Sequence, residues 1–344
     1  RTLRSVEARA ALDAMLPDLI DAIGQAADPD RALARWETLL ARLPSAVNLF
    51  RLFEQRPGLL EVVLRVLTLA PPLADELARR PELLDRLIDR SAFDLPGTVA
   101  ELADRMQRSD SGDDDYERRL DRIRRIVGEE RFALGVQLIE ARHDPMEIAA
   151  GLSRVAEAAL MTASSAACHE FARAHGTIPG GELVILGLGR LGGGALTHAS
   201  DLDLVYLFDG PAEGESDGRR PLSVSLYFNR LGQRVTAALS VPTAEGALYE
   251  VDTRLRPQGN QGPPAVSLES FARYQKEAAW TWEHMALCRA RPVFGSTRAR
   301  ERLAAIARAL GGELRREIGL PLLAIDSADD LATRFRAWRR VAPG

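Results

Sequence analysis

Two aspartates separated by one residue, Asp201 and Asp203, stand at the start of an apolar run that ends at Phe208. The run predicts a strand over residues 202–208, and side chains along a strand alternate between its two faces. Both carboxylates therefore share one face, where they repel each other unless a cation lies between them. Mg²⁺ prefers oxygen ligands and accepts water and phosphate oxygens in the rest of its shell. The pair predicts a site for one or two Mg²⁺ ions.

A third carboxylate, Asp252, lies in another strand-like segment, residues 248–255, together with two arginines. Strand alternation places Asp252, Arg254 and Arg256 on one face. A metal ligand beside guanidinium groups suits a triphosphate, so these arginines and Arg190 are the candidates to hold a pyrophosphate leaving group. Asp252 is a third metal ligand and a candidate acceptor for the proton of an attacking hydroxyl. The alternative, a surface ladder of salt bridges, loses weight because the Asp-x-Asp strand precedes this segment.

A glycine-rich stretch, Gly187–Gly192, follows a strand-like run and matches the GxGxxG pattern of dinucleotide-binding proteins. A crossover helix needs about ten or more residues, whereas only residues 193–200 separate the pattern from the next strand. That strand also opens with aspartates, which a buried parallel strand would not do. We therefore expect backbone N–H groups of Gly192 and Gly193, aided by a short helix after them, to bind phosphate oxygens.

Helical and strand-like patterns divide the chain into three parts. Residues 1–143 repeat apolar positions at every third and fourth place, with breaks at prolines, which predicts a helical linker or bundle region. Residues 144–300 contain few strands among helices, which predicts the catalytic domain, and residues 301–344 are expected to form a helical segment. The predicted fold class is α+β, with the elements of the catalytic domain at residues 144–175 (helix), 182–188 and 202–208 (strands), 222–239 (helix), 248–255 (strand), 268–276 and 280–289 (helices).

Composition narrows the class of protein. The formal net charge of the 344 residues is −4, which argues against a nucleic-acid-binding surface. No apolar run approaches 18 residues, so we expect neither a membrane span nor a secretory signal. Cys168 and Cys288 lack the spacing of a zinc site and indicate a reducing, cytoplasmic setting. The chain begins at Arg1 without a methionine, so we expect it to be a piece of a longer protein.

Two glycines, an Asp-x-Asp strand and a later strand aspartate together resemble the nucleotidyltransferase superfamily, which includes DNA polymerase β. Longer motifs resemble the glutamine synthetase adenylyltransferase family in particular. They include the strand motif Glu-Val-Asp-Thr-Arg-Leu-Arg-Pro and the helix motif Ala-Trp-Thr-Trp-Glu-His. The stretches that carry this resemblance are residues 175–204, 242–257, 279–284 and 289–291.

The resemblance implies a polymerase β-like catalytic domain with a small mixed sheet, and it adds Ser200 to the nucleotide-binding residues. That family has two halves, one adding AMP and one removing it by phosphorolysis, and the motifs quoted above look like the adding half. The implied reaction moves AMP from ATP to a tyrosine of glutamine synthetase and releases pyrophosphate. The implied partners are glutamine synthetase and the PII signal-transduction protein, with glutamine as an effector and nitrogen supply as the signal.

Three alternatives remain open at this point: the adenylyl-removing phosphorylase on the same fold, a catalytically silent regulatory fragment, and, with least support, a nucleic-acid polymerase. Two departures from the family bear on them. The family usually has lysine where Arg190 stands, so the positive charge remains but its geometry differs. Residues after about 300 match poorly, and the signature of the family's following helical domain is absent, so residues 301–344 look like a truncated carboxyl-terminal domain.

Several side chains near these motifs have no settled role. Trp280 and Trp282 cannot share one helix face at a spacing of two, so we expect at least one to be exposed and the other to pack. Glu283 is either a further carboxylate of the site or a helix salt bridge. His198 follows the glycine stretch and is a candidate phosphate contact or a surface histidine. Arg289 and Arg291 are expected to reach the nucleotide or to pair with acids.

Overall fold

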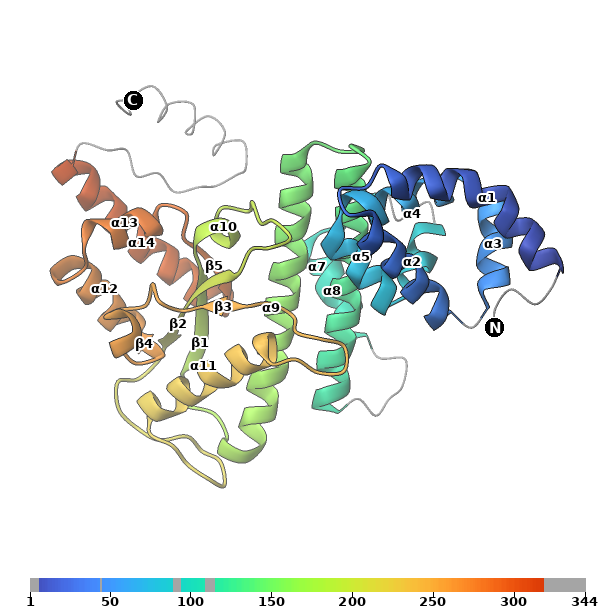
Figure 1. Ribbon diagram of the computed structural model, residues 1–344. Coiled ribbons are helices and arrows are strands. Elements are labelled where there is room, and N and C mark those ends of the chain that lie inside the picture. Colours follow the sequence, from blue (N-terminus) through green and yellow to red (C-terminus); the bar gives the residue numbers. More distant parts are fainter. Residues whose placement is uncertain (1–5, 44, 89–93, 109–114, 319–344) are drawn as a thin grey trace. The chain divides into compact units, whose positions relative to one another are not determined.

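The computed structural model describes residues 6–43, 45–88, 94–108 and 115–318 of the chain (Figure 1). These residues fall into two compact units. One unit contains Arg1–Leu95 and Gly128–Gly151, and the other contains Pro96–Val127 and Leu152–Gly344. The predicted helical region, residues 1–143, is therefore divided between the two units, and its segment 96–127 belongs with the predicted catalytic residues.

The first unit is entirely helical in its described part. Proline occupies the first position of three of its helices, where its missing N–H costs nothing and its fixed φ suits the helix. The side chains of Asp28 and Ser45 accept N–H groups of the first turn of two helices, at 3.1 and 3.4 Å. The helices of its amino-terminal part are α1 (Val6–Gly24), α2 (Pro29–Arg42), α3 (Ala46–Gln55), α4 (Pro57–Leu69), α5 (Pro71–Arg79) and α6 (Leu83–Ile88).

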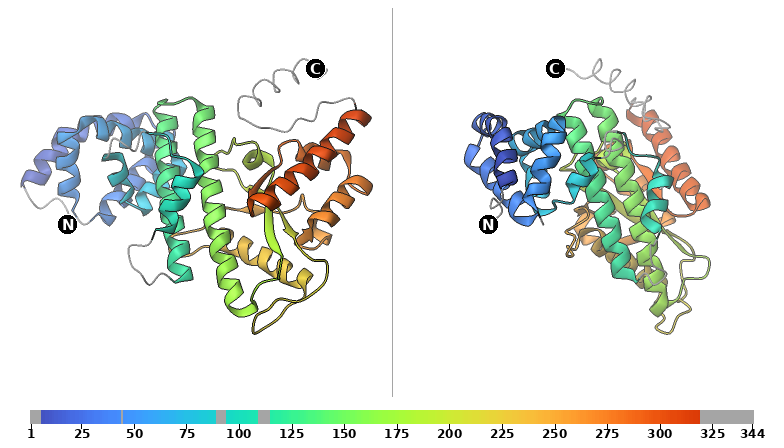
Figure 2. Two further views of the ribbon diagram at one scale, coloured as in Figure 1. Left: turned by 180° about the vertical axis from the view of Figure 1, so that it is seen from behind. Right: turned by 90° about the vertical axis from the view of Figure 1, so that its right-hand side faces the viewer.

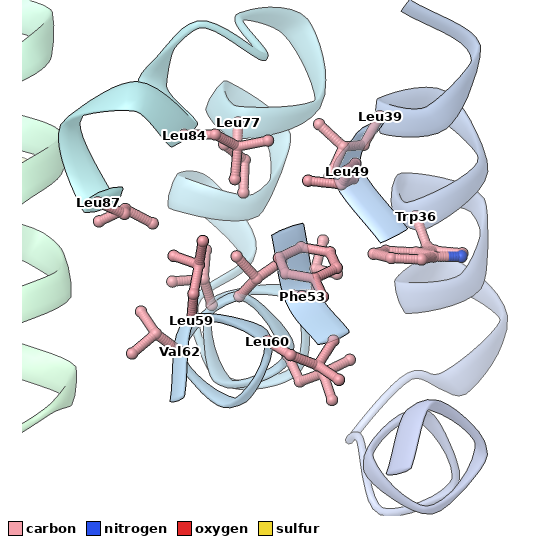
Figure 3. Packing of buried hydrophobic residues seen from close by; sticks show 14 of the residues in the cluster. Trp36, Leu39, Leu49, Phe53, Leu59, Leu60, Val62, Leu77, Leu84 and Leu87 are labelled. Carbon is pink, nitrogen blue, oxygen red and sulfur yellow. The ribbon is translucent and has the colours of Figure 1, made fainter. Parts of the chain in front are cut away.

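The core of this unit is built from leucine and aromatic side chains of all six helices (Figure 3). Trp36 of α2 stacks on Phe53 of α3 with ring centroids 6.3 Å apart. Leu39 and Leu77 belong to the same cluster and are fully buried. No single helix among the described residues is long and apolar enough to cross a membrane. Only α4 and α5 together, bent by 117°, have the required length and composition.

The second unit contains a five-stranded mixed sheet with the order β3-β2-β1-β5 and with β4 also paired to β2. β1 runs antiparallel to β2 and β5, whereas β3 and β4 run parallel to β2. The predicted α+β class with a small mixed sheet is confirmed. The strands are β1 (Glu182–Gly187), β2 (Leu202–Asp209), β3 (Val251–Asp252), β4 (Ala265–Ser267) and β5 (Arg291–Phe294).

Helices cover both faces of this sheet (Figures 1 and 2). On one face Phe208 stacks on Phe228 of α11 with ring centroids 4.5 Å apart. On the other face Leu207 packs in a cluster with Phe271 of α12 and Leu303 of α14. The helices of the unit, two of which also reach the first unit, are α7 (Val99–Gln107), α8 (Tyr116–Ile139), α9 (Pro145–His175), α10 (Gly189–Gly192), α11 (Val224–Ser240), α12 (Leu268–Glu277), α13 (Thr281–Leu287) and α14 (Thr297–Ile318).

Two predicted strands and the long helix agree closely with the structure, whereas the segment after α11 does not. The predicted strand over residues 248–255 is wrong in extent, because β3 contains only Val251 and Asp252 and the chain turns directly after them. The short strands β4 and β5 were not predicted, since the sequence after residue 265 was interpreted as helical. Gly176 ends α9 with φ +70°, the left-handed conformation expected of a glycine at that place.

A buried arginine of α8 holds the segment that leads to Asp252. Arg124 donates hydrogen bonds to the carbonyl oxygens of Ala238, Val241 and Gly246, each at 2.9 Å. These carbonyls lie at the end of α11 and in the loop after it, where helix carbonyls lack intrahelical partners. The guanidinium group therefore takes the place of a helix cap and fixes the path of the chain toward β3.

Replacing Arg124 with methionine is expected to lower the free energy of unfolding by about 2 kcal/mol, since one buried and two partly buried carbonyls lose their donor. Urea unfolding followed by circular dichroism measures this change. The matched control is Arg118→Met, because Arg118 lies on the same helix but is exposed, and this variant should unfold like the wild type. Equal stability of the two variants would show that Arg124 does not hold the loop.

Candidate nucleotidyl-transfer site

The site is built on two parallel strands in register. Leu202 pairs with Val251, and Asp203 pairs with Asp252. The N–H of Leu202 also donates to the carbonyl of Glu250 at 2.9 Å, which extends the pairing by one residue. Neighbouring strands lie about 4.8 Å apart, and registered residues of parallel strands project from the same face. The pairing therefore places the carboxylates of Asp203 and Asp252 side by side, as the sequence predicts.

Charge and burial act together on Asp203. Its pKa is raised above that of an ordinary aspartate, first because the carboxylate is partly buried and then because Asp201 and Asp252 carry like charges nearby. Arg254 opposes this shift. Asp201 itself lies just before β2 and is exposed. All three predicted aspartates thus contribute to one electrostatic site, with Asp203 at its centre.

Arg254 reaches Asp252, but not by the predicted strand alternation. The chain turns after Asp252, and the backbone N–H of Arg254 donates to Asp252 Oδ1 at 2.8 Å. The Arg254 Nε donates to both carboxylate oxygens, at 3.0 and 2.8 Å, and its Nη2 also donates to Oδ2. This clasp lowers the pKa of Asp252 below its usual value. In the chain alone, a guanidinium group thus neutralises one of the two paired carboxylates.

Arg256 turns away from Asp252 and stabilises the turn. Its Nη1 donates to the carbonyl and the hydroxyl oxygen of Thr253, both at 2.9 Å. Its Nε donates to the carbonyl of Gly262 at 3.3 Å. The predicted common face of Asp252, Arg254 and Arg256 is therefore wrong, because a strand of two residues cannot align residues 252, 254 and 256. The positive charge of Arg256 still helps to lower the pKa of Asp252.

The turn at Gly189 leaves space for the carboxylate of Asp203. Gly189 begins α10 with φ +53°, and a Cβ built on it would overlap the Asp203 carboxylate. The N–H of Leu188 donates to the carbonyl of Asp203 at 2.9 Å. Gly189 is therefore required both by its left-handed conformation and by the closeness of Asp203. Sequence analysis missed this role, although the GxGxxG pattern itself contains the residue.

Gly192 and Gly193 are placed differently from the prediction. They lie within or at the end of α10, and no helix follows them before β2 among these described residues. Their N–H groups donate to the carbonyls of Leu188 and Gly189, at 2.7 and 3.2 Å. A Cβ on Gly192 would overlap the carbonyl oxygen of Arg289. Close packing is thus one demonstrable reason for glycine at position 192.

Arg291 supports the same turn from β5. Its Nε and Nη2 donate to the carbonyls of Gly192 and Leu191, at 3.5 and 3.4 Å. Its Nη1 forms an ion pair with Glu157 of α9 at 2.6 Å. Of the two expectations for this arginine, pairing with an acid is the one that the structure shows. The guanidinium group ties α9, α10 and β5 together next to the site.

The remaining predicted nucleotide ligands, Arg190 and Ser200, flank the turn. Arg190 is exposed on α10, and among the described residues no acid forms an ion pair with it. Ser200 Oγ accepts the N–H of Thr197 at 3.0 Å and shares a hydrogen bond with the Thr197 hydroxyl at 2.9 Å. Ser200 thus closes the loop that enters β2. Binding of nucleotide by either residue stays a prediction.

Glu283 and its neighbouring tryptophans have distinct environments. Glu283 is buried, and its carboxylate accepts the Tyr274 hydroxyl at 3.0 Å and the Trp280 N–H at 2.8 Å. These bonds begin α13 and tie it to α12. Trp280 is 71% exposed and Trp282 is 55% exposed. We expected one of the two tryptophans to pack, and this is wrong, because Trp280 at the N-cap of α13 and Trp282 in its first turn are both exposed to solvent.

The carboxylate oxygens of this site suit a cation whose other ligands are water and substrate oxygens. Among the described residues, no three His, Cys, Asp or Glu side chains stand close enough to form a complete metal cage. Asp203 and Asp252 are nevertheless paired in register, with the charge of Asp201 nearby. Mg²⁺ is usually held by one or two carboxylates together with waters and substrate phosphates. Two paired carboxylates therefore fit Mg²⁺ and do not fit a fully protein-bound ion.

A glycine turn beneath an Asp-x-Asp strand, with a third aspartate on the neighbouring parallel strand, defines a nucleotidyltransferase-type catalytic unit. Comparison with known proteins agrees. The sequence model of the glutamate-ammonia ligase adenylyltransferase family matches residues 60–306. The chain therefore belongs to this family.

Relatives extend the comparison beyond the family model. A bifunctional glutamine synthetase adenylyltransferase/adenylyl-removing enzyme of Mesorhizobium japonicum is 43% identical over 304 residues, which cover 86% of this chain and 30% of the relative. The protein of the same description from Agrobacterium fabrum is 43% identical over 296 residues, with the same coverage. The one from Xanthobacter autotrophicus is 41% identical over 304 residues. The chain spans about 30% of the length of the curated relatives it matches.

Replacing Asp203 with asparagine is expected to stabilise the metal-free chain at pH 7 by roughly 0.5–1 kcal/mol, after allowance for solvent screening. The pKa of Asp203 is raised in the folded chain, so the ionised carboxylate costs stability as the pH rises through that pKa. The advantage of the variant should vanish below pH 3.8, the ordinary aspartate value. Urea unfolding at several pH values measures it.

The matched control is Glu250→Gln, because Glu250 is an exposed carboxylate one residue before β3. Its stability should follow the wild type at every pH. A variant of Asp203 that is less stable than the wild type at pH 7 would contradict the raised pKa.

Proposed function

We propose that this chain transfers AMP from ATP to a tyrosine of glutamine synthetase and releases pyrophosphate. The observation that carries the proposal is the registered pair of Asp203 and Asp252 over the turn at Gly189. Membership of the glutamate-ammonia ligase adenylyltransferase family supports it. So do relatives that are described as bifunctional glutamine synthetase adenylyltransferase/adenylyl-removing enzymes.

Asp203 and Asp252 would hold Mg²⁺, with Asp201 as a further ligand for one or two ions. Bound Mg²⁺ supplies charge neutralisation of the triphosphate and stabilisation of an in-line displacement. Arg254 donates to both carboxylate oxygens of Asp252 in the chain alone, so Mg²⁺ binding would also change this contact. Release of Arg254 from Asp252 would free a guanidinium group beside the leaving pyrophosphate, where its bidentate geometry suits phosphate oxygens.

The proposed transfer forms one bond at the α-phosphorus and breaks another. The phenolic oxygen of the tyrosine forms a bond to the α-phosphorus of ATP, and the bond from that phosphorus to the bridging oxygen breaks. Pyrophosphate leaves with the electron pair, and the phenol loses its proton. Sequence analysis made Asp252 the candidate proton acceptor. Release of Arg254 from Asp252 would remove the main cause of its lowered pKa, so Asp252 remains the proposed acceptor.

We assign the adding direction rather than the removing one. The Glu-Val-Asp motif that ends at Asp252 and the Trp-Thr-Trp helix α13 resemble the adding half of the family. The removing reaction would use inorganic phosphate as the nucleophile and release ADP. The two directions therefore differ in their products, and an assay that follows both settles the direction.

Partners and regulation follow from the same resemblance. We propose glutamine synthetase as the protein substrate, and the PII protein and glutamine as the signals that adjust the reaction to nitrogen supply. A cytoplasmic location follows from this substrate. Exposed Arg190, Ser200 and the turn at Gly192 and Gly193 remain the proposed nucleotide contacts.

The test is AMP transfer from α-labelled ATP, with Mg²⁺, onto unmodified glutamine synthetase. The wild type should label the synthetase, and Asp203→Asn should lower the rate about a hundredfold or more, because a group that stabilises the transition state by several kcal/mol is lost. Glu213→Gln, an exposed carboxylate in the loop after β2 and outside the site, should retain the wild-type rate.

Labelling that survives in Asp203→Asn would overturn the assigned site. Release of ADP from adenylylated synthetase upon addition of phosphate, without labelling in the forward assay, would favour the adenylyl-removing enzyme. ATP binding without either reaction would favour a regulatory fragment.

A further inference from the structure

A cavity of about 460 Å³ lies in the unit that contains the sheet, away from the paired aspartates. It opens where β1 begins, at Glu182 and Leu183, and where β5 ends, at Phe294. The register places Glu182 opposite Asp209, whereas Gly187 at the other end of β1 lies opposite Leu204, next to Asp203. Five residues of strand separate these two ends by roughly 16 Å. The cavity is therefore distinct from the nucleotide site.

The walls of the cavity are mainly apolar and aromatic. They come from α9, α11 and the end of β5, and include Phe228, Leu231, Val293 and Phe294. The volume falls within the range of roughly 300–1,000 Å³ that is usual for small-molecule sites, which combine apolar walls with a few polar groups. The cavity could thus enclose the apolar or aromatic body of one small molecule.

Arg300 is the cationic side chain among the described residues that line the cavity. Arg300, in the first turn of α14, has a buried Nε for which the described residues provide no hydrogen-bond acceptor. A buried donor without an acceptor is unfavourable, so a ligand that supplies an acceptor binds with a gain. Arginine binds carboxylate and phosphate oxygens best, because its donors form a planar fork.

The nearest acidic and nucleophilic groups do not satisfy Arg300. Glu182 also lines the cavity, but its carboxylate accepts the Ser296 N–H at 2.8 Å and the Ser296 hydroxyl at 2.7 Å. Burial raises the pKa of the Cys168 thiol to about 12, so Cys168 stays neutral and adds no negative charge. The Glu182 carboxylate therefore has donors of its own in Ser296, and Arg300 supplies the cationic donor that lines the cavity.

We infer that this cavity is a second ligand site, for a small molecule that has one anionic group and an apolar or aromatic body. Arg300 binds the anionic group, a carboxylate or a phosphate, and the rings of Phe228 and Phe294 enclose the body. This site is independent of the proposed AMP transfer, because the cavity lies at the opposite end of the strands from Asp203.

The test uses 8-anilinonaphthalene-1-sulfonate, whose sulfonate and aromatic rings match these requirements. Fluorescence titration of the full chain should show one saturable site. Arg300→Met should raise the dissociation constant about tenfold or more, the effect expected of losing a charged hydrogen bond. Ser165→Trp should weaken binding as well, because Ser165 lines the cavity from the exposed side of α9 and a tryptophan there would fill it.

The matched control is Arg298→Met, because Arg298 lies in the same turn of α14 but is exposed. This variant should bind the probe as the wild type does. Equal affinities of Arg300→Met and Arg298→Met would overturn the proposed site. Weaker binding in Arg300→Met without weaker binding in Ser165→Trp would also overturn it, since the probe would then lie outside the cavity. Thermal unfolding of each variant shows that the fold is retained.

Discussion

The repulsion between two carboxylates in register is the constraint on which this structure depends. Parallel pairing of β2 with β3 fixes Asp203 beside Asp252, and no relaxation of the strands can separate them without breaking that pairing. Like charges at this spacing raise the pKa of one member and require a counter-charge near the other. In the chain alone Arg254 provides that counter-charge. With a nucleotide present, a divalent cation is the natural substitute.

The surrounding elements keep this pair in place. Gly189 leaves room for the Asp203 carboxylate, and Arg291 binds the carbonyls at the end of α10. Arg124 anchors the loop that carries the chain from α11 to Asp252. Each of these contacts uses a backbone carbonyl or a missing Cβ, so the site depends on backbone positions contributed by α8, α10 and β5. The cavity beside Arg300 lies where β1 begins and β5 ends, so the two ends of these strands have different chemistry.

Much of this arrangement could be predicted from the sequence, because long apolar runs and their flanking aspartates depend on local pattern. β1, β2 and the side-by-side placement of Asp203 and Asp252 are of this kind. The short strands β4 and β5 could not be predicted, since three or four residues adopt extended structure only when a neighbouring strand pairs with them. The contact between Arg254 and Asp252 depends on the turn that follows Asp252, which the strand-like sequence pattern does not reveal. The exposure of both Trp280 and Trp282 was not predicted either, because Trp280 precedes α13 as its N-cap residue instead of lying within the helix.

The most direct test of the central claim is a Mn²⁺ titration followed by electron paramagnetic resonance, with wild type, Arg254→Gln and Asp203→Asn, each measured with and without ATP. If Arg254 and a cation compete for Asp252, Arg254→Gln should bind Mn²⁺ more tightly than the wild type when ATP is absent. Asp203→Asn should bind it at least about tenfold more weakly, since one of two carboxylate ligands is lost. Weaker or unchanged binding in Arg254→Gln, or unchanged binding in Asp203→Asn, would contradict the account.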